Sequence, residues 1–154
     1  MEQHNENPLE ELRYWETKSV DELVMELEEL YDFEQAPDIL TALEKKAPVQ
    51  AVRMGADIIK YDRGDQFLQA CVFSNLFDPF GQAMLQAAEE RRKPMEWCFL
   101  GSVVHELTLY RDRICPSPRL LEKILLSYAL SDRKEKIDQS EWRAFLDCYH
   151  LRAE

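Results

Sequence analysis

The sequence predicts an all-α protein, and three observations carry this prediction. Only four of the 154 residues are glycine and seven are proline, which is unlike the turn-rich composition of β-sandwiches and barrels. Apolar residues recur three and four positions apart along most of the chain. Prolines stand where several of these patterns begin, a position at which the missing backbone N–H has little cost. The length fits one helical domain over residues 1–154.

Two helices are predicted near the N-terminus. Asn7, Pro8 and Glu10 have the pattern of an N-cap, a first-turn proline and a capping box. Ser19 and Glu22 form a second capping box ahead of a clear helical apolar pattern. The two helices should bury Leu9, Leu12, Trp15, Leu23, Leu27 and Leu30.

The rest of the chain predicts further helices joined by short turns, for about nine helical segments in all. Pro37 and Pro48 begin two helices that meet near Ala47, and Asp65 caps the next one. Three later segments begin at Asp78-Pro79, at Lys93-Pro94 and after the loop Cys115-Pro116-Ser117-Pro118. Asp138 and Glu141 form a capping box for the last helix.

Helix starts at residues 48, 65, 79 and 94 define a two-helix unit of roughly 30 residues, near the length of α-solenoid repeats. Short turns between residues 37 and 110 favour antiparallel helical hairpins. The spacing therefore predicts a HEAT-like α-solenoid of such hairpins. An irregular helical bundle with periodic prolines is the alternative.

Negative charge is concentrated at the N-terminal end. Residues 1–44 hold fourteen acidic side chains against two basic ones, Arg13 and Lys18, whereas residues 45–154 hold sixteen acidic and seventeen basic side chains. The net charge of −11 therefore belongs to the N-terminal part. Such an uncompensated acidic surface serves either solubility or a basic partner.

The candidate partner-binding residues lie in this acidic part. Three glutamates of the second helix share one face, with no Lys or Arg four positions on to relieve their repulsion. Three more acidic residues extend the charge past the helix end. The six candidates are Glu22, Glu26, Glu29, Asp32, Glu34 and Asp38. Tyr14, Trp15 and Tyr31 are candidate aromatic anchors, with burial in the core as the alternative.

Several functions are disfavoured by the composition. A strongly acidic protein must overcome phosphate repulsion to bind nucleic acid. No apolar run reaches the length of a membrane span, and the polar N-terminus has no secretory signal pattern, so we expect a cytoplasmic protein.

Four scattered cysteines without CxxC spacing indicate reduced and mostly buried thiols. Arg91-Arg92-Lys93 and the surroundings of Arg111 and Arg113 are candidates for a local basic patch, and the preferred alternative is a helix C-terminus, whose dipole favours cations.

No complete catalytic or metal motif is present. His105-Glu106 begins like the zinc-protease motif HExxH, but Leu109 stands where the second histidine is needed. Cys148 and His150 lie two positions apart, on different sides of a helix. Residues 130–142 resemble half an EF-hand without its first ligand or its glycine. We therefore expect no enzymatic activity, no cofactor and no metal, and a small metal-dependent hydrolase is the weakest alternative.

The stretch from Ala42 to Ala88, ALEKKAPVQAVRMGADII followed by FLQACVFSNLFDPFGQAMLQAA, resembles degenerate HEAT-type helical pairs. With its small size and acidic surface, the chain resembles the helical immunity proteins of bacterial toxin systems, including contact-dependent growth inhibition. This resemblance implies binding of one cognate toxin domain, often a nuclease, whose active site is blocked. The alternative is a helical adaptor or regulatory module that binds another protein.

Overall fold

A computed structural model describes residues 8–30 and 33–151, and this part of the chain contains helices and no strands. The all-α prediction is therefore confirmed. The α-helices are α1 (Pro8–Glu16), α2 (Val20–Glu28), α3 (Ala36–Lys46), α4 (Pro48–Lys60), α5 (Gln66–Glu90), α6 (Trp97–Leu109), α7 (Pro118–Leu130) and α8 (Gln139–Cys148). Two short 3₁₀ helices, η1 (Phe33–Gln35) and η2 (Lys134–Lys136), precede α3 and α8.

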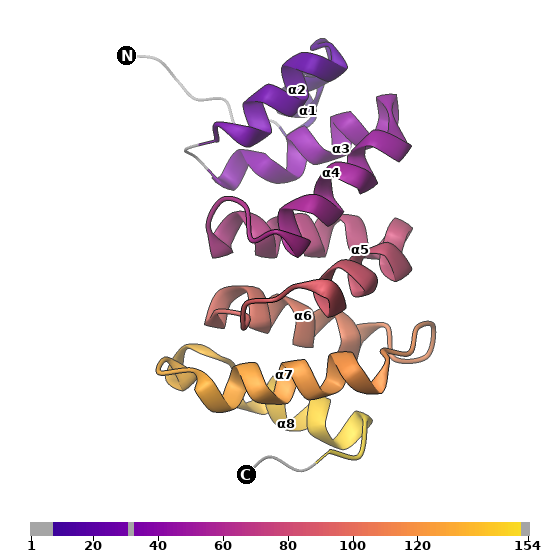
Figure 1. Cartoon of the computed structure of the whole chain (residues 1–154). Coiled ribbons are helices and arrows are strands. Elements are labelled where there is room, and N and C mark those ends of the chain that lie inside the picture. Colours follow the sequence, from indigo (N-terminus) through magenta and orange to yellow (C-terminus); the bar gives the residue numbers. More distant parts are fainter. Residues whose placement is uncertain (1–7, 31–32, 152–154) are drawn as a thin grey trace.

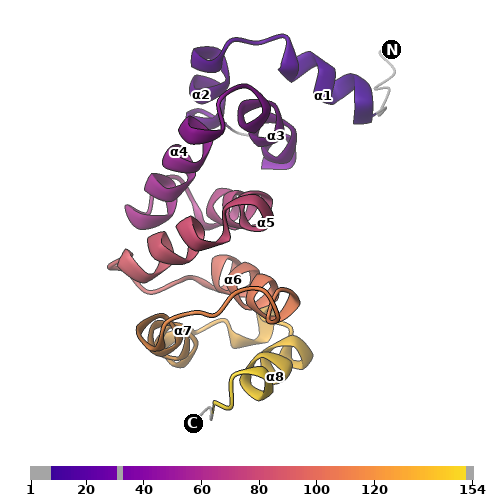
Figure 2. The same cartoon turned by 90° about the vertical axis from the view of Figure 1, so that its right-hand side faces the viewer.

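The helices stack in chain order along one long axis (Figure 1). Seen from the side, they form two layers (Figure 2). One layer, called here the α2/α4/α7 layer, also contains the second half of α5, and the other contains α1, α3, the first half of α5, α6 and α8. Contacts follow the same order, since α3 packs against α1, α2, α4 and α5, and α6 packs against α5, α7 and α8.

Helix α5 crosses from one layer to the other. The sequence predicts two helices here, starting at residues 65 and 79, and the element Gln66–Glu90 consists of two helical halves joined at a kink beside Pro79. Proline removes a backbone hydrogen bond and its ring clashes with the preceding turn. Phe80 accordingly leaves helical geometry, with φ −133° and ψ 44°. The predicted break at Asp78-Pro79 is therefore confirmed, and the two halves lie in different layers (Figure 2).

The predicted N-caps are mostly confirmed. Ser19 and Glu22 form a complete capping box, with N···O distances of 2.8 and 3.1 Å. The Asp65 carboxylate accepts hydrogen bonds from the first turn of α5. Asp138 caps α8 in the same way, but the Glu141 side chain contacts α6 and does not close the predicted box. The Asn7 cap lies outside the described residues.

Buried apolar side chains form one cluster that extends through the stack. At its centre, Phe73 of α5 meets Phe99 of α6 edge to face, with ring centroids 5.7 Å apart. Near the C-terminal end, Trp142 of α8 stacks on Tyr128 of α7 at 4.1 Å. Edge-to-face and offset-stacked rings add to the stabilisation from area burial.

A buried arginine joins three parts of the fold. Arg91, which ends α5, is 3% exposed. Its guanidinium donates hydrogen bonds to the Ile59 carbonyl (3.0 Å), to the Gln69 side-chain oxygen (3.1 Å) and to the Asp62 carboxylate (3.0 Å), and its Nε donates to the Lys93 carbonyl (3.1 Å). These partners lie at the end of α4, in the turn that follows it, in the first turn of α5 and in the loop after α5. The guanidinium therefore holds the two ends of α5 next to the end of α4.

The remaining polar atoms of this network are also paired. The Gln69 amide nitrogen donates to the Asp62 carboxylate (2.9 Å) and to the Arg63 carbonyl (3.0 Å). Burial acts to raise the pKa of Asp62, but the bonds from Gln69 and the charge of Arg91 outweigh it, so this pKa lies below its usual value. The predicted helix C-terminus at Arg91 is confirmed, since Arg91 is the C-cap of α5, but the residue is buried and does not belong to an exposed basic patch. The positive charge of Arg91 offsets the partial negative charge of the carbonyls at the C-terminal end of α4, through its bond to the Ile59 carbonyl.

We expect Arg91→Met to destabilise the protein by about 3 kcal/mol, because it removes the donor to the Gln69 side-chain oxygen and to the Ile59 carbonyl and one of the donors to Asp62. Urea unfolding followed by circular dichroism measures this loss. Arg92→Met is the matched control, since Arg92 is exposed and makes no hydrogen bond or ion pair with any other described residue. Its unfolding free energy should stay within about 0.5 kcal/mol of the parent. Equal losses in both variants would contradict the role of Arg91.

Two glycine substitutions should change stability in opposite directions. A Cβ at Gly55 in α4 would clash with Cδ1 of the buried Leu76, so Gly55→Ala should destabilise by about 1–3 kcal/mol through overpacking. A Cβ at Gly101 in α6 meets nothing within 4 Å, so Gly101→Ala should stabilise by up to about 1 kcal/mol through helix propensity. Thermal unfolding of both variants provides the comparison, and a stabilising Gly55→Ala would be inconsistent with close contact between α4 and α5.

Candidate functional site

Helix α2 carries a face of exposed carboxylates. Glu22, Glu26 and Glu29 are all exposed, and Leu23 and Leu27 on the opposite face are fully buried. We call these three glutamates the acidic ridge. The ridge forms because carboxylates three and four positions apart share a helix face and the leucines direct the other face into the core.

The three carboxylates of the ridge are not equivalent. Glu22 accepts a hydrogen bond from the Ser19 backbone N–H, which lowers the pKa of Glu22. The carboxylates of Glu26 and Glu29 have no hydrogen bond or ion pair to any residue in the described ranges 8–30 and 33–151. These two are thus the carboxylates of the ridge that are fully available to a partner.

The other three predicted site residues do not belong to the acidic ridge. Asp32 lies outside the described residues. Glu34 is exposed in η1, whereas Asp38 is partly buried in the first turn of α3, where the helix dipole favours an acidic side chain. In the last turn of α3, Lys45 pairs with Glu16 of α1 at 2.6 Å. The structure thus brings together three of the six candidates on α2, and Glu34 and Asp38 belong to other elements.

A groove that the sequence analysis missed lies beside the ridge helix. It has a volume of about 440 Å³ and lies between α2, α4, the turn after α4 and the start of α5. Its lining combines four apolar side chains with several polar and charged ones. The lining residues are Val24, Glu28, Gln50, Arg53, Met54, Asp57, Ile58, Arg63, Gly64 and Leu68. They come from four separate elements, so no local pattern in the sequence marks them as one site.

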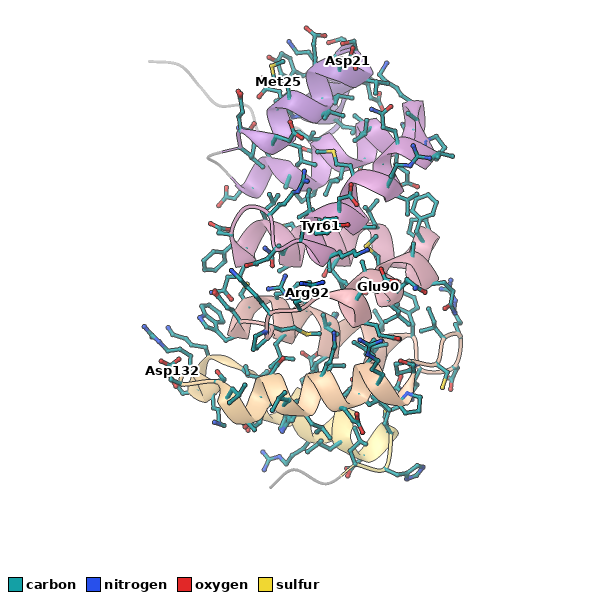
Figure 3. All side chains as sticks on the ribbon, in the orientation of Figure 1. Asp21, Met25, Tyr61, Glu90, Arg92 and Asp132 are labelled. Atoms are coloured by element: carbon teal, nitrogen blue, oxygen red, sulfur yellow. The ribbon has the colours of Figure 1, made fainter. Side chains whose placement is uncertain are left out.

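Two large apolar side chains are exposed on the same face of the molecule. Met25 on α2 is 58% exposed and Tyr61 after α4 is 57% exposed. Figure 3 shows both on the face that the α2/α4/α7 layer turns to the viewer, with Tyr61 below α2. Lys60 and Arg63 place their cationic groups 5.1 and 5.8 Å from the Tyr61 ring. Cation–π contacts at these distances favour one orientation of the ring.

The predicted aromatic anchors have different outcomes. Trp15 is only 8% exposed and belongs to the core, so its use as a contact residue is wrong. Tyr14 is 53% exposed, and its ring packs edge-on against Trp15 with centroids 4.9 Å apart. Tyr31 lies outside the described residues.

His105 lies at the contact between α6 and α8. Its Nδ1 is 2.6 Å from a carboxylate oxygen of Glu141, and this hydrogen bond raises the pKa of His105. The neighbouring Glu106 is largely buried, which raises the pKa of its carboxyl. The contact between His105 and Glu141 joins α6 to α8. It is a structural contact whose strength depends on pH, because His105 titrates.

The segment that resembles half an EF-hand contains a lysine among its carbonyls. Lys134 begins η2, and its ammonium donates hydrogen bonds to the carbonyls of Ala129 (3.2 Å) and Ser131 (2.8 Å). These contacts agree with the interpretation of the segment as a charged loop. Within residues 8–30 and 33–151, no three His, Cys, Asp or Glu side chains come close enough together to hold a metal ion.

All four cysteines are present as thiols. Cys71, Cys98 and Cys148 are partly buried and Cys115 is exposed, so the prediction of mostly buried thiols holds only in part. Burial raises the pKa of the Cys71 and Cys98 thiols and makes them less reactive.

Along the described stretches of the chain, no helix has the length and apolar character that a membrane crossing requires. The chain matches no protein-family model, no curated protein and no solved structure at a significant level.

The contact between His105 and Glu141 gives a pH prediction. Because the folded-state pKa of His105 is raised, its stabilising contribution is present below the unfolded pKa of about 6.5 and is lost as pH rises through the folded value. Glu141→Gln should lower the midpoint of His105 in an NMR titration. The stability difference between this variant and the parent should be largest in acid and should shrink above the folded pKa.

Arg143→Gln on the same helix is the control, since Arg143 is exposed and makes no hydrogen bond or ion pair with another described residue. It should leave the His105 midpoint unchanged. An unchanged midpoint in Glu141→Gln would show that the contact does not set the pKa.

Proposed function

We propose that this protein is an immunity-type inhibitor that binds a cognate toxin domain with a basic surface, such as a nuclease, and neutralises it. The observation that carries the proposal is the acidic ridge, in which Glu26 and Glu29 have no cationic partner among the described residues. Like charges on one helix face cost a few tenths of a kcal/mol per pair. A basic partner would convert this repulsion into attraction.

The same charges explain how such an inhibitor would work. A nuclease needs a basic cleft to hold phosphates, and a carboxylate surface can occupy that cleft in place of the substrate. Complementary charges also speed association through electrostatic steering. The proposed action is binding in the cytoplasm, without catalysis and without a cofactor.

The helix arrangement supports a HEAT-like α-solenoid for this inhibitor. Successive helices follow one another along a single axis and alternate between the two layers (Figure 2). In such a stack each pair contacts mainly its neighbours, and a long face remains open to a partner. The α2/α4/α7 layer would supply that face here.

A helical adaptor that binds another cellular protein is the second candidate. It is favoured by Met25 and Tyr61, whose exposed apolar surface suits a partner of low charge. Ionic strength separates the two functions, because a steered complex between an acidic and a basic protein associates more slowly in salt. An apolar contact would change little.

Neutralising the acidic ridge should slow association with the toxin domain. The triple variant Glu22→Gln, Glu26→Gln, Glu29→Gln keeps the fold, because glutamine at position 22 preserves the capping box. Its association rate constant at low salt should fall by about tenfold or more, with a smaller change at high salt. Stopped-flow mixing with the purified toxin domain measures both values.

The matched control removes three exposed negative charges far from α2, by the changes Glu122→Gln, Glu135→Gln and Asp147→Asn. The partner itself is identified by capture on the tagged full chain from the native cell, at low and high salt. Recovery of one basic toxin domain supports the inhibitor function. Recovery of a housekeeping assembly that resists salt supports the adaptor, and equal association rates for the two triple variants would exclude the ridge as the contact.

A further inference from the structure

We propose that the groove between α2 and α4 is a docking site for a segment of the partner protein in which an apolar side chain stands next to a Lys or Arg. The proposal rests on the function proposed above and adds a second contact to the acidic ridge. In this arrangement the acidic ridge attracts the partner, and the groove fixes the position and orientation of the bound segment.

The floor of the groove suits an apolar side chain. Ile58 of α4 and Leu68 of α5 are each 5% exposed, and Val24 and Met54 are partly buried beside them. A volume of about 440 Å³ is in the range of pockets that receive a ligand group or a partner's anchor residue. Methionine adapts its shape readily, so Met54 would allow the floor to fit an aliphatic or an aromatic anchor.

The rim of the groove carries charges that the protein does not pair. The side chains of Glu28 on α2 and of Arg53 and Asp57 on α4 make no hydrogen bond or ion pair to other residues in the described part of the chain. Elsewhere on the surface, comparable side chains do form ion pairs, as between Lys60 and Glu90 at 3.3 Å. Even Arg53 and Asp57, one helical turn apart, do not pair. In a helix, a basic residue that precedes an acidic one by four positions forms a weaker ion pair than the reverse order does.

These unpaired charges define the chemistry of the occupant. Glu28 stands on the wall formed by the acidic helix α2, which favours a Lys or Arg from the partner. Arg53 and Arg63 on the opposite side favour backbone carbonyls or a carboxylate. A polypeptide segment offers an apolar side chain, a cation and carbonyls together. A small apolar molecule would leave the charged side chains of the rim without partners.

The surroundings of the groove extend the contact. Met25 and Tyr61 are exposed on the same face (Figure 3), and Tyr61 adjoins Arg63 of the rim through a cation–π contact. Tyrosine, methionine and arginine are enriched in protein interfaces, and tyrosine and arginine among the residues that dominate binding. A partner segment in the groove would bury both exposed side chains at its edges.

Selection of phage-displayed random peptides on the full chain provides the test, followed by fluorescence anisotropy with the enriched peptides. We expect peptides with an apolar residue next to a Lys or Arg. Their dissociation constant should rise about tenfold or more in Glu28→Lys and in Arg53→Glu. Exchange of the peptide's basic residue for Glu should restore binding to Glu28→Lys. Failure to enrich peptides, or equal binding to the parent and to both variants, would overturn the proposal.

The controls separate this proposal from the proposed function. Glu122→Lys and Arg143→Glu change the same types of charge at exposed positions of α7 and α8, and peptide binding should not respond to them. The triple glutamine variant of the ridge should keep peptide binding but lose rapid toxin association. Toxin association that depends on the ridge alone would uphold the function and overturn the groove. Peptide binding without any toxin partner would uphold the groove and reject the inhibitor function.

Discussion

The buried guanidinium of Arg91 is the interaction on which the middle of the structure depends. Burying a charge is costly unless it is fully hydrogen-bonded, and here Asp62, Gln69 and two carbonyls satisfy it. The ammonium of Lys123 on α7 donates in turn to the carbonyls of Glu89 and Arg91. One connected set of polar contacts thus links α4, α5 and α7, and it adds directional bonds to apolar packing, which specifies orientation less strictly.

The same contacts position the candidate docking groove. Asp62 adopts a positive φ of 56° in the turn after α4, and Gly64 follows with a φ of 68°. Left-handed geometry is disfavoured for a non-glycine residue, so the bonds from Arg91 and Gln69 to Asp62 help to maintain it. This turn carries Tyr61, Arg63 and Gly64 at the edge of the groove. The geometry of the proposed contact surface therefore depends on a buried cation that never reaches it.

The two parts of the proposed interface have different physical roles. Carboxylates on an exposed helix act over a Debye length of about 8 Å at physiological salt, and their main effect is on encounter. The groove acts only on contact, through apolar burial and short-range pairing, and its main effect is on the lifetime of the complex. Glu28 belongs to the ridge helix and to the rim of the groove, so it joins the two regions.

The sequence by itself determined the helical class, most helix starts and the exposure of Glu22, Glu26 and Glu29, because helical periodicity and caps such as Ser19 and Asp65 act within a few residues. Only the tertiary structure decided that Arg91 is buried and that α2, α4 and α5 enclose a groove. These features arise from packing between distant segments. Local propensity contains no information about which buried partner a side chain will meet.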